Sequence, residues 1–208
     1  PLLLYSLMMT MHHQVGVIIL QVLFSGDPMV SAYAVALQTG GFVVLLATST
    51  NRFYLPQLSV LLLRHDADSL RKRGARRLAV LGPLTGAYLV VIFVFGRQIL
   101  ATFGEQFVDG YPALCILGVG TSFSTLLSLS AYALQYLGRN KLPLVWTAVS
   151  DGLSIALCFP LAYHYGATGA ALAYAGPLVM KFVALQCHAT YEIRKLRQTL
   201  PDTDVAAQ

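Results

Sequence analysis

Long apolar segments alternate with short segments rich in Gly, Pro, polar or charged residues along almost the whole chain. A bilayer core about 30 Å thick needs about 20 mainly apolar residues per helix. On that scale the pattern predicts six membrane-spanning helices, at about residues 2–24, 31–62, 78–97, 111–137, 142–163 and 167–190. Transmembrane β-strands, which alternate over about ten residues, do not fit such continuous apolar segments. The sequence therefore predicts an all-α, polytopic transmembrane helix bundle with a short polar tail at 191–208.

Positive charges divide the predicted loops into two sets. Eleven of the 14 Lys and Arg residues fall in three clusters, at 64–77, 139–141 and 194–197. The intervening loops with almost no positive charge are 25–30, 98–110 and 163–167. The positive-inside rule places the three clusters in the cytoplasm and the intervening loops on the other side. Both ends of this chain are then predicted to be cytoplasmic.

Composition excludes several other classes of protein. Charged residues make up 11% of the chain, against about 25% in a typical soluble domain. No basic stripe carries interleaved aromatic residues, so we predict no nucleic-acid partner. Cys115, Cys158 and Cys187 form no CxxC pair, and no nucleotide-binding or hydrolase motif is found. We therefore predict no metal site, no cofactor and no enzymatic activity.

Polar residues inside the predicted spans recur at helical spacing, which places them on one side of each helix. In the first span they are Ser6, Thr10, His13, Gln14 and Gln21. A helix that faces lipid has no use for such a stripe, whereas one that faces a bundle interior or a wet cavity does. For Ser and Thr, ordinary hydrogen bonds between helices are the more common explanation.

Ionisable residues inside the spans carry more information, because a charge at the bilayer centre costs at least about 2.5–3.5 kcal/mol. Arg52 is predicted to lie about 15 Å inside the cytoplasmic end of its helix, which favours a cavity position over snorkelling. Lys181 is nearer to such an end, where snorkelling is at least as good an explanation as a cavity position. Asp151 falls near the middle of its span and is either a proton carrier or a carboxyl paired with its neighbours. His12 and His13 are mid-span too, and one of them can face the cavity.

Motifs in the second half of the chain indicate a family. Residues 138–141 read GRNK, residues 165–173 read YGATGAALA, and upstream 103–105 (FGE) precedes 111–114 (YPAL). In this order and spacing the segments resemble the C-terminal part of bacterial polysaccharide-unit flippases, of the multidrug/oligosaccharidyl-lipid/polysaccharide exporter superfamily. The resemblance covers nearly the whole chain, as helices seven to twelve of the family. Asp151 departs from the family pattern, in which a neutral polar residue is expected.

This resemblance implies a two-lobed transporter with a central cavity that opens alternately to either side. The six predicted spans would form the second lobe, and an N-terminal lobe would complete the cavity. The start of the chain inside an apolar span, without Met, leads to the same expectation. The implied function is to flip a polyprenyl-pyrophosphate-linked glycan across the bacterial cytoplasmic membrane. Membrane lipids, a glycan polymerase and assembly enzymes are the further partners expected.

Candidate site residues follow from the charge of that substrate. The guanidinium of Arg52 suits phosphate oxygens, which it can bind in a bidentate manner. The predicted lining of the head-group site also includes Asn51, Thr48, His13, Gln14, Gln21 and Lys181. An ion gradient would drive transport, and the candidate coupling residues are Asp151, His12 and His13.

Three other functions agree less well with these residues. A multidrug extrusion antiporter of the same superfamily is expected to hold acidic groups in its cavity, whereas cations outnumber acids among the candidates here. A membrane-embedded glycosyltransferase or ligase needs paired carboxylates or a large external loop, and neither is visible. A non-transporting scaffold for polysaccharide assembly has no need of polar stripes in its interior. The antiporter and the scaffold stay open as alternatives.

Overall fold

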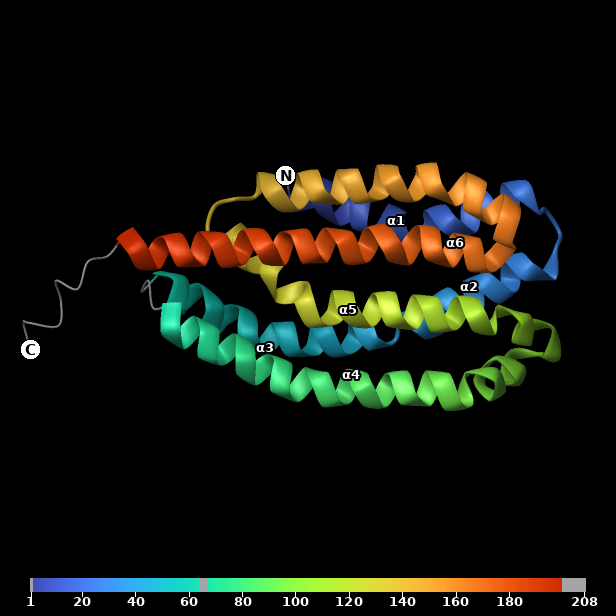
Figure 1. Cartoon of the computed structure of the whole chain (residues 1–208), viewed down its shortest axis with the longest axis horizontal. Helices are drawn as coiled ribbons and strands as arrows, with labels where there is room; N and C mark the ends of the chain where they lie inside the picture. The colour runs from blue at the N-terminus through green and yellow to red at the C-terminus, as the bar shows by residue number, and fades with distance from the viewer. Residues whose placement is uncertain (1, 64–66, 200–208) are drawn as a thin grey trace, which may run out of the picture.

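The computed structural model describes residues 2–63 and 67–199, with side chains for 13–57, 59–60, 69 and 72–195. Every regular element in the described part is helical, so the predicted all-α class is confirmed. The elements are α1 (Leu2–Leu23), α2 (Pro28–Gly41), α3 (Val43–Leu63), α4 (Ala67–Phe103), the 3-10 helix η1 (Glu105–Gly110), α5 (Tyr111–Tyr136) and α6 (Lys141–Thr199). They lie side by side in an elongated bundle (Figure 1).

Several helices are long and apolar enough to cross a membrane, which fits a multi-pass membrane protein. The four ranges that meet this criterion are Pro28–Gln57, Lys72–Phe103, Glu105–Tyr136 and Lys141–Lys195. A shorter apolar helix covers His13–Leu23. Large apolar side chains also face outward, among them Val80, Val90 and Phe93 on α4. Such a surface is stable against lipid and would be a liability in water.

The predicted second span consists of two helices, because α2 ends at Gly41 and α3 begins at Val43. The start of α2 has a local cause. Asp27 caps the helix by accepting a hydrogen bond from the Met29 N–H at 2.8 Å, and Pro28 occupies the first turn, where its missing N–H costs nothing. Pro56 lies inside α3 and does not end it.

The long helix α6 folds back on itself at Gly166, whose φ of 57° and ψ of −133° interrupt the helical backbone. Residues 141–165 form a first arm and residues 167–199 a second arm, which run in opposite directions (Figure 1). A positive φ favours glycine at the bend. Gly169 is also required, because a Cβ there would overlap the Leu161 carbonyl of the first arm. The predicted spans 142–163 and 167–190 therefore correspond to the two arms of one bent element.

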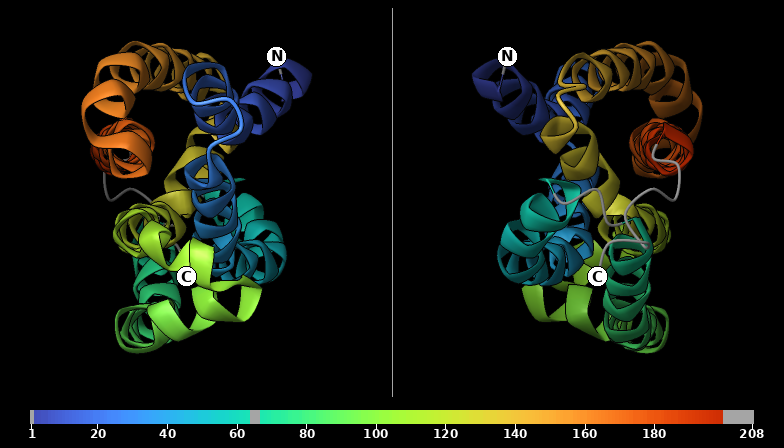
Figure 2. Two further views of the ribbon diagram at one scale, coloured as in Figure 1. Left: turned by 90° about the vertical axis from the view of Figure 1, so that its right-hand side faces the viewer. Right: turned by 90° about the vertical axis from the view of Figure 1, so that its left-hand side faces the viewer.

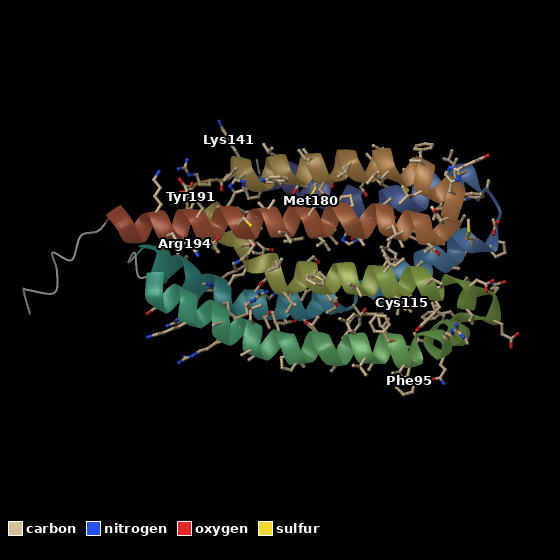
Figure 3. All side chains as sticks on the ribbon, in the orientation of Figure 1. Phe95, Cys115, Lys141, Met180, Tyr191 and Arg194 are labelled. Carbon is tan, nitrogen blue, oxygen red and sulfur yellow. The ribbon has the colours of Figure 1, made fainter. Side chains whose placement is uncertain are left out.

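The turns of the chain gather at two opposite ends of the bundle. The α1–α2 connection, η1 and the Gly166 bend lie at one end, and the α5–α6 connection and the start of α4 lie at the other (Figure 1). Lys141 and Arg194 mark this second end in Figure 3. We call it the basic end, because Lys72, Arg73, Arg76, Arg139, Lys141, Arg194 and Lys195 belong to the segments that meet there.

Helix α5 is the central element, in contact with α2, α3, α4 and α6 (Figure 2). Small residues let its neighbours approach closely. A Cβ on Gly120 would lie 2.7 Å from the Ala175 Cβ, and one on Gly40 would lie 3.1 Å from the Leu117 Cβ. Thr121 Oγ1 donates a hydrogen bond to the Gly40 carbonyl at 2.6 Å. Close backbone approach and hydroxyl bonds of this kind are typical of helix packing in membranes.

The concentration of positive charges in alternate loops predicts that the basic end is cytoplasmic. In cells that express the protein without its native cysteines, Asp27→Cys should react with a membrane-impermeant maleimide while the cells are intact. Lys72→Cys should react only after the cells are opened, because it lies at the basic end. Glu105→Cys and Lys141→Cys provide a second pair with the same expected contrast. Labelling of the Lys72 and Lys141 positions in intact cells, with the other two protected, would reverse the predicted topology.

Candidate functional site

Four polar side chains from α1 and both arms of α6 extend from the exposed surface of α1 into the bundle, and we call them the interior cluster: His13, Asp151, Tyr174 and Lys181. The Tyr174 hydroxyl lies 3.0 Å from His13 Nδ1, and their ring centroids are 5.6 Å apart. The Asp151 carboxylate interacts electrostatically with Lys181 and with Tyr174. The cluster thus links α1 to both arms of α6 through groups that can exchange protons.

Helical spacing and the Gly166 bend bring these residues together. On the first arm, Asp151 shares a face with Thr147 and Ser154, which are four and three residues away, and Ser150 precedes it directly in the sequence. On the second arm, Tyr174 and Lys181 are seven residues apart and therefore also share a face. Ser154 Oγ donates to the Ala173 carbonyl across the two arms at 2.7 Å. The two polar faces are thus joined directly, beside Asp151 and Tyr174.

Burial increases across the cluster. His13 is exposed, Asp151 is half-buried, Tyr174 is 3% exposed and Lys181 is 0% exposed. Met180, the neighbour of Lys181, lies near the middle of the length of the bundle (Figure 3). A side chain with no exposed surface does not reach the interface, so snorkelling does not account for Lys181. Its ammonium also lies 5.1 Å from the centre of the Phe182 ring, within range of a cation–π interaction.

Buried hydroxyl groups surround this cluster. Within the described part of the chain, Thr147 Oγ1, Ser150 Oγ and Tyr33 Oη are buried and make no hydrogen bond. Tyr33 interacts electrostatically with Tyr174 and Cys158. Leaving a buried polar group without a hydrogen bond costs about 1–3 kcal/mol. The cluster therefore offers oxygen atoms that an ion or its water could use, beside a carboxylate and an ammonium.

A second buried cation, Arg77, lies in α4 with 1% exposure. Its Nη2 donates to Asn51 Oδ1 at 2.9 Å and to Ser128 Oγ at 2.8 Å. In the sequence, Arg77 stands out only as a member of the cationic cluster at 64–77. The spacing of Arg77 pointed to its burial, because Arg77, Leu81 and Thr85 follow one another at four-residue intervals and so share one face of α4. All three are buried in the structure.

Comparison with known proteins identifies no relative. No family model, no curated protein and no solved structure matches the chain. Function is therefore inferred from the residues and their contacts.

The structure brings together some of the predicted site residues. His13, Asp151 and Lys181, proposed on separate grounds, meet in the interior cluster. Tyr174 completes the cluster and was not predicted, since a Tyr in an apolar helix is common. The side chain of His12 lies outside the described residues.

The other predicted residues lie elsewhere. Gln14 and Gln21 are exposed on α1, and Thr48 and Arg52 are exposed on α3. Thr48 Oγ1 donates to the Val44 carbonyl of its own helix at 3.0 Å. In Figure 2, α1 and α3 lie on one side of the bundle and the second arm of α6 on the other, while α3 packs against α4 and α1 contacts Tyr174 of the second arm. The side chain of Asn51 does not join that of Arg52 at the surface. It is buried and accepts a hydrogen bond from Arg77.

In the described part of the chain, no group of three or more His, Cys, Asp or Glu residues is arranged to hold a metal ion. The ionisable groups of the interior cluster include one acid, one lysine and one imidazole. Such a set can pass or exchange protons, or exchange a cation for the Lys181 ammonium at Asp151. Its one carboxylate is that of Asp151.

Proposed function

We propose that this chain is one lobe of an ion-coupled membrane transporter, and that the interior cluster is its coupling site. The observation that carries the proposal is Lys181, which has no exposed surface and interacts with Asp151 of the other α6 arm inside an apolar bundle. Ionisable groups inside membrane proteins are costly and occur mainly where ions, protons or substrates pass. Apolar residues of similar volume would often stabilise such a site as well or better. The charges are therefore attributed to function.

The proposed substrate is a polyprenyl-pyrophosphate-linked glycan, flipped to the outer leaflet of the bacterial cytoplasmic membrane. Its phosphates cannot cross hydrocarbon without compensation of their charge. Arg52 is exposed on α3, and its planar guanidinium can pair with phosphate oxygens through two parallel hydrogen bonds. Thr48 on α3 and Gln14 and Gln21 on α1 are also exposed and add hydrogen-bonding groups.

We assign this side of the lobe, formed by α1 and α3, to the wall of the transport cavity. A second lobe that faces it would complete the cavity, while α4 presents its apolar outer face to lipid. The lobe surface then serves two environments. Polar groups line the cavity, and valine, leucine and phenylalanine face the membrane.

Coupling between the two sites is proposed to run through α1. Protonation of Asp151, or binding of a cation to it, weakens its attraction for Lys181 and so loosens the two α6 arms from each other. Tyr174 on the second arm contacts His13 on α1, so a shift of this arm moves α1. Because α1 also carries Gln14 and Gln21, the state of the cluster changes the cavity wall. A proton or cation can shift the equilibrium between the tightly held and the loosened α6 arms only if it binds more tightly to one of these two states. Asp151 is the group proposed to provide this difference in affinity.

Translocation of a polyprenyl-pyrophosphate-linked glycan tests the proposal. Vesicles that contain the assembled transporter, with both lobes, should move the glycan to the opposite leaflet faster when an ion gradient is imposed. Vesicles that contain this lobe alone should not, because half of the cavity wall is absent. Equal rates in transporter vesicles and in protein-free vesicles would refute the proposed substrate.

A further inference from the structure

The guanidinium of Arg77 joins three helices near the basic end of the bundle. It extends from α4, and its Nη2 bonds to Asn51 Oδ1 of α3 and Ser128 Oγ of α5. It also contacts the α5 backbone, because Nη1 donates to the Leu126 carbonyl at 3.1 Å and Nη2 to the Thr125 carbonyl at 3.3 Å. One side chain thus connects α3, α4 and a single turn of α5.

That turn of α5 is where the helix changes direction. In Figures 1 and 2 the C-terminal third of α5, drawn in yellow, leaves the line of the preceding turns and runs towards α6. No Pro or Gly lies between residues 121 and 137 to cause a kink. Hydroxyl groups instead bond back to the carbonyls of the preceding turn: Thr121 to Leu117, Ser124 to Thr121, Ser128 to Thr125 and Ser130 to Leu127. Back-bonds of this kind, and side chains that insert into the backbone ladder, are recognised causes of helix bending.

Helices α3 and α4 form a hairpin that can move as one unit. Beside the bond between Arg77 and Asn51, Arg73 Nη1 donates to Gln57 Oε1 one turn nearer to the basic end. The two arginines are four residues apart on α4 and use two amide side chains of α3. Arg77 differs from Arg73 in that it is buried and reaches beyond the hairpin to α5.

The acceptors of Arg77 favour a reversible contact. All four hydrogen-bond acceptors are neutral oxygen atoms, and three of them share Nη2. Among the described residues, Arg77 Nε is buried and makes no hydrogen bond. Bidentate pairing with a carboxylate would hold the guanidinium more strongly. The arrangement is suited to a bond that breaks and forms again during a conformational change.

We propose that Arg77 is a conformational latch between the α3–α4 hairpin and the bend of α5. When the latch is closed, it holds the bent part of α5 against the hairpin and closes the bundle towards the basic end. When the latch opens, the turn at residues 125–128 separates from α3 and α4 and becomes accessible. This latch does not depend on the substrate or on the coupling role of the interior cluster.

Thiol labelling at position 125 measures the latch directly. Thr125 is 1% exposed, and its hydroxyl makes no hydrogen bond in the described part, so Thr125→Cys removes none. In a background without Cys115, Cys158 and Cys187, we expect N-ethylmaleimide to label this cysteine slowly. Arg77→Met should raise the labelling rate about tenfold or more, because the turn is then released. Arg76→Met is the matched control, since Arg76 is the exposed neighbour on the same helix, and it should leave the rate unchanged.

Asn51→Leu provides a second variant, in which one acceptor of the latch is lost and Arg77 is kept. It should raise the labelling rate by a smaller factor, and the double variant should label no faster than Arg77→Met alone, because both changes open the same contact. Unchanged labelling in Arg77→Met, or an equal rise in Arg76→Met, would overturn the latch. If Arg77→Met does not reach the membrane, Asn51→Leu decides: faster labelling supports the latch and unchanged labelling contradicts it.

Discussion

Asp151→Asn is expected to lower the free energy of unfolding by about 1–3 kcal/mol, because the buried Lys181 loses the charge of a half-buried carboxylate that interacts with it. The substitution keeps the shape of the side chain and removes its charge. Lys181, with no exposed surface, then loses the carboxylate that interacts with it. Unfolding of the purified protein in detergent measures the change. Asp109→Asn is the matched control, because Asp109 is exposed near the end of η1, and it should have almost no effect.

The double variant Asp151→Asn/Lys181→Met separates the charge pair from ordinary packing. It removes both charges, so most of the stability lost in Asp151→Asn should return. The two single substitutions are therefore expected to be strongly non-additive. A double variant that is as unstable as the sum of the two single variants would show that Asp151 and Lys181 do not act as a pair.

Arg52→Ala is expected to reduce glycan translocation about a hundredfold while membrane abundance stays near normal. Two charge-assisted hydrogen bonds to a phosphate contribute about 3 kcal/mol together, and about 1.4 kcal/mol corresponds to tenfold in rate. Arg52 is exposed on α3, so its loss leaves no cavity in the described core. Arg52→Lys should restore part of the activity, because an ammonium keeps the charge and loses the planar geometry.

The control for Arg52 is Arg76→Ala, which removes an exposed arginine of α4 outside the proposed cavity wall. Its translocation rate should stay close to that of the unmodified protein. A wild-type rate in Arg52→Ala would contradict the phosphate contact and leave Arg52 as an anchor at the membrane interface. Loss of the Arg52→Ala protein from the membrane would instead assign the residue to folding.

Much of the fold can be predicted from local patterns in the sequence. Apolar length predicts the helices, and α1 and α5 end within one residue of the predicted spans 2–24 and 111–137. The break between α2 and α3 was not predicted, because Gly41 and Phe42 interrupt neither the apolar pattern nor the charge pattern. Pro56 lies inside α3, which continues through it to Leu63. The Gly166 bend lies in the predicted loop 163–167, and a second glycine, Gly169, follows three residues later.

The site was predictable only in part, because burial and contacts depend on how the helices pack. His13, Asp151 and Lys181 were identified separately as costly or polar groups inside apolar segments. That they meet depends on the fold of the two α6 arms about Gly166, which brings residues 151 and 181 together across 30 positions of sequence. Arg77 was assigned to the cytoplasmic surface because its neighbours in sequence are cationic. Its burial is decided by the face of α4 on which it lies, four residues before Leu81.

The response of translocation to an imposed ion gradient tests the coupling role of the interior cluster most directly. The protein and its folded Asp151→Asn/Lys181→Met variant are compared in sealed vesicles, with and without the gradient, after assembly with the second lobe. We expect the gradient to accelerate glycan translocation by the unmodified protein and to leave the rate of the variant unchanged. The same acceleration in both proteins would contradict the account, because the gradient would then act through groups other than Asp151 and Lys181.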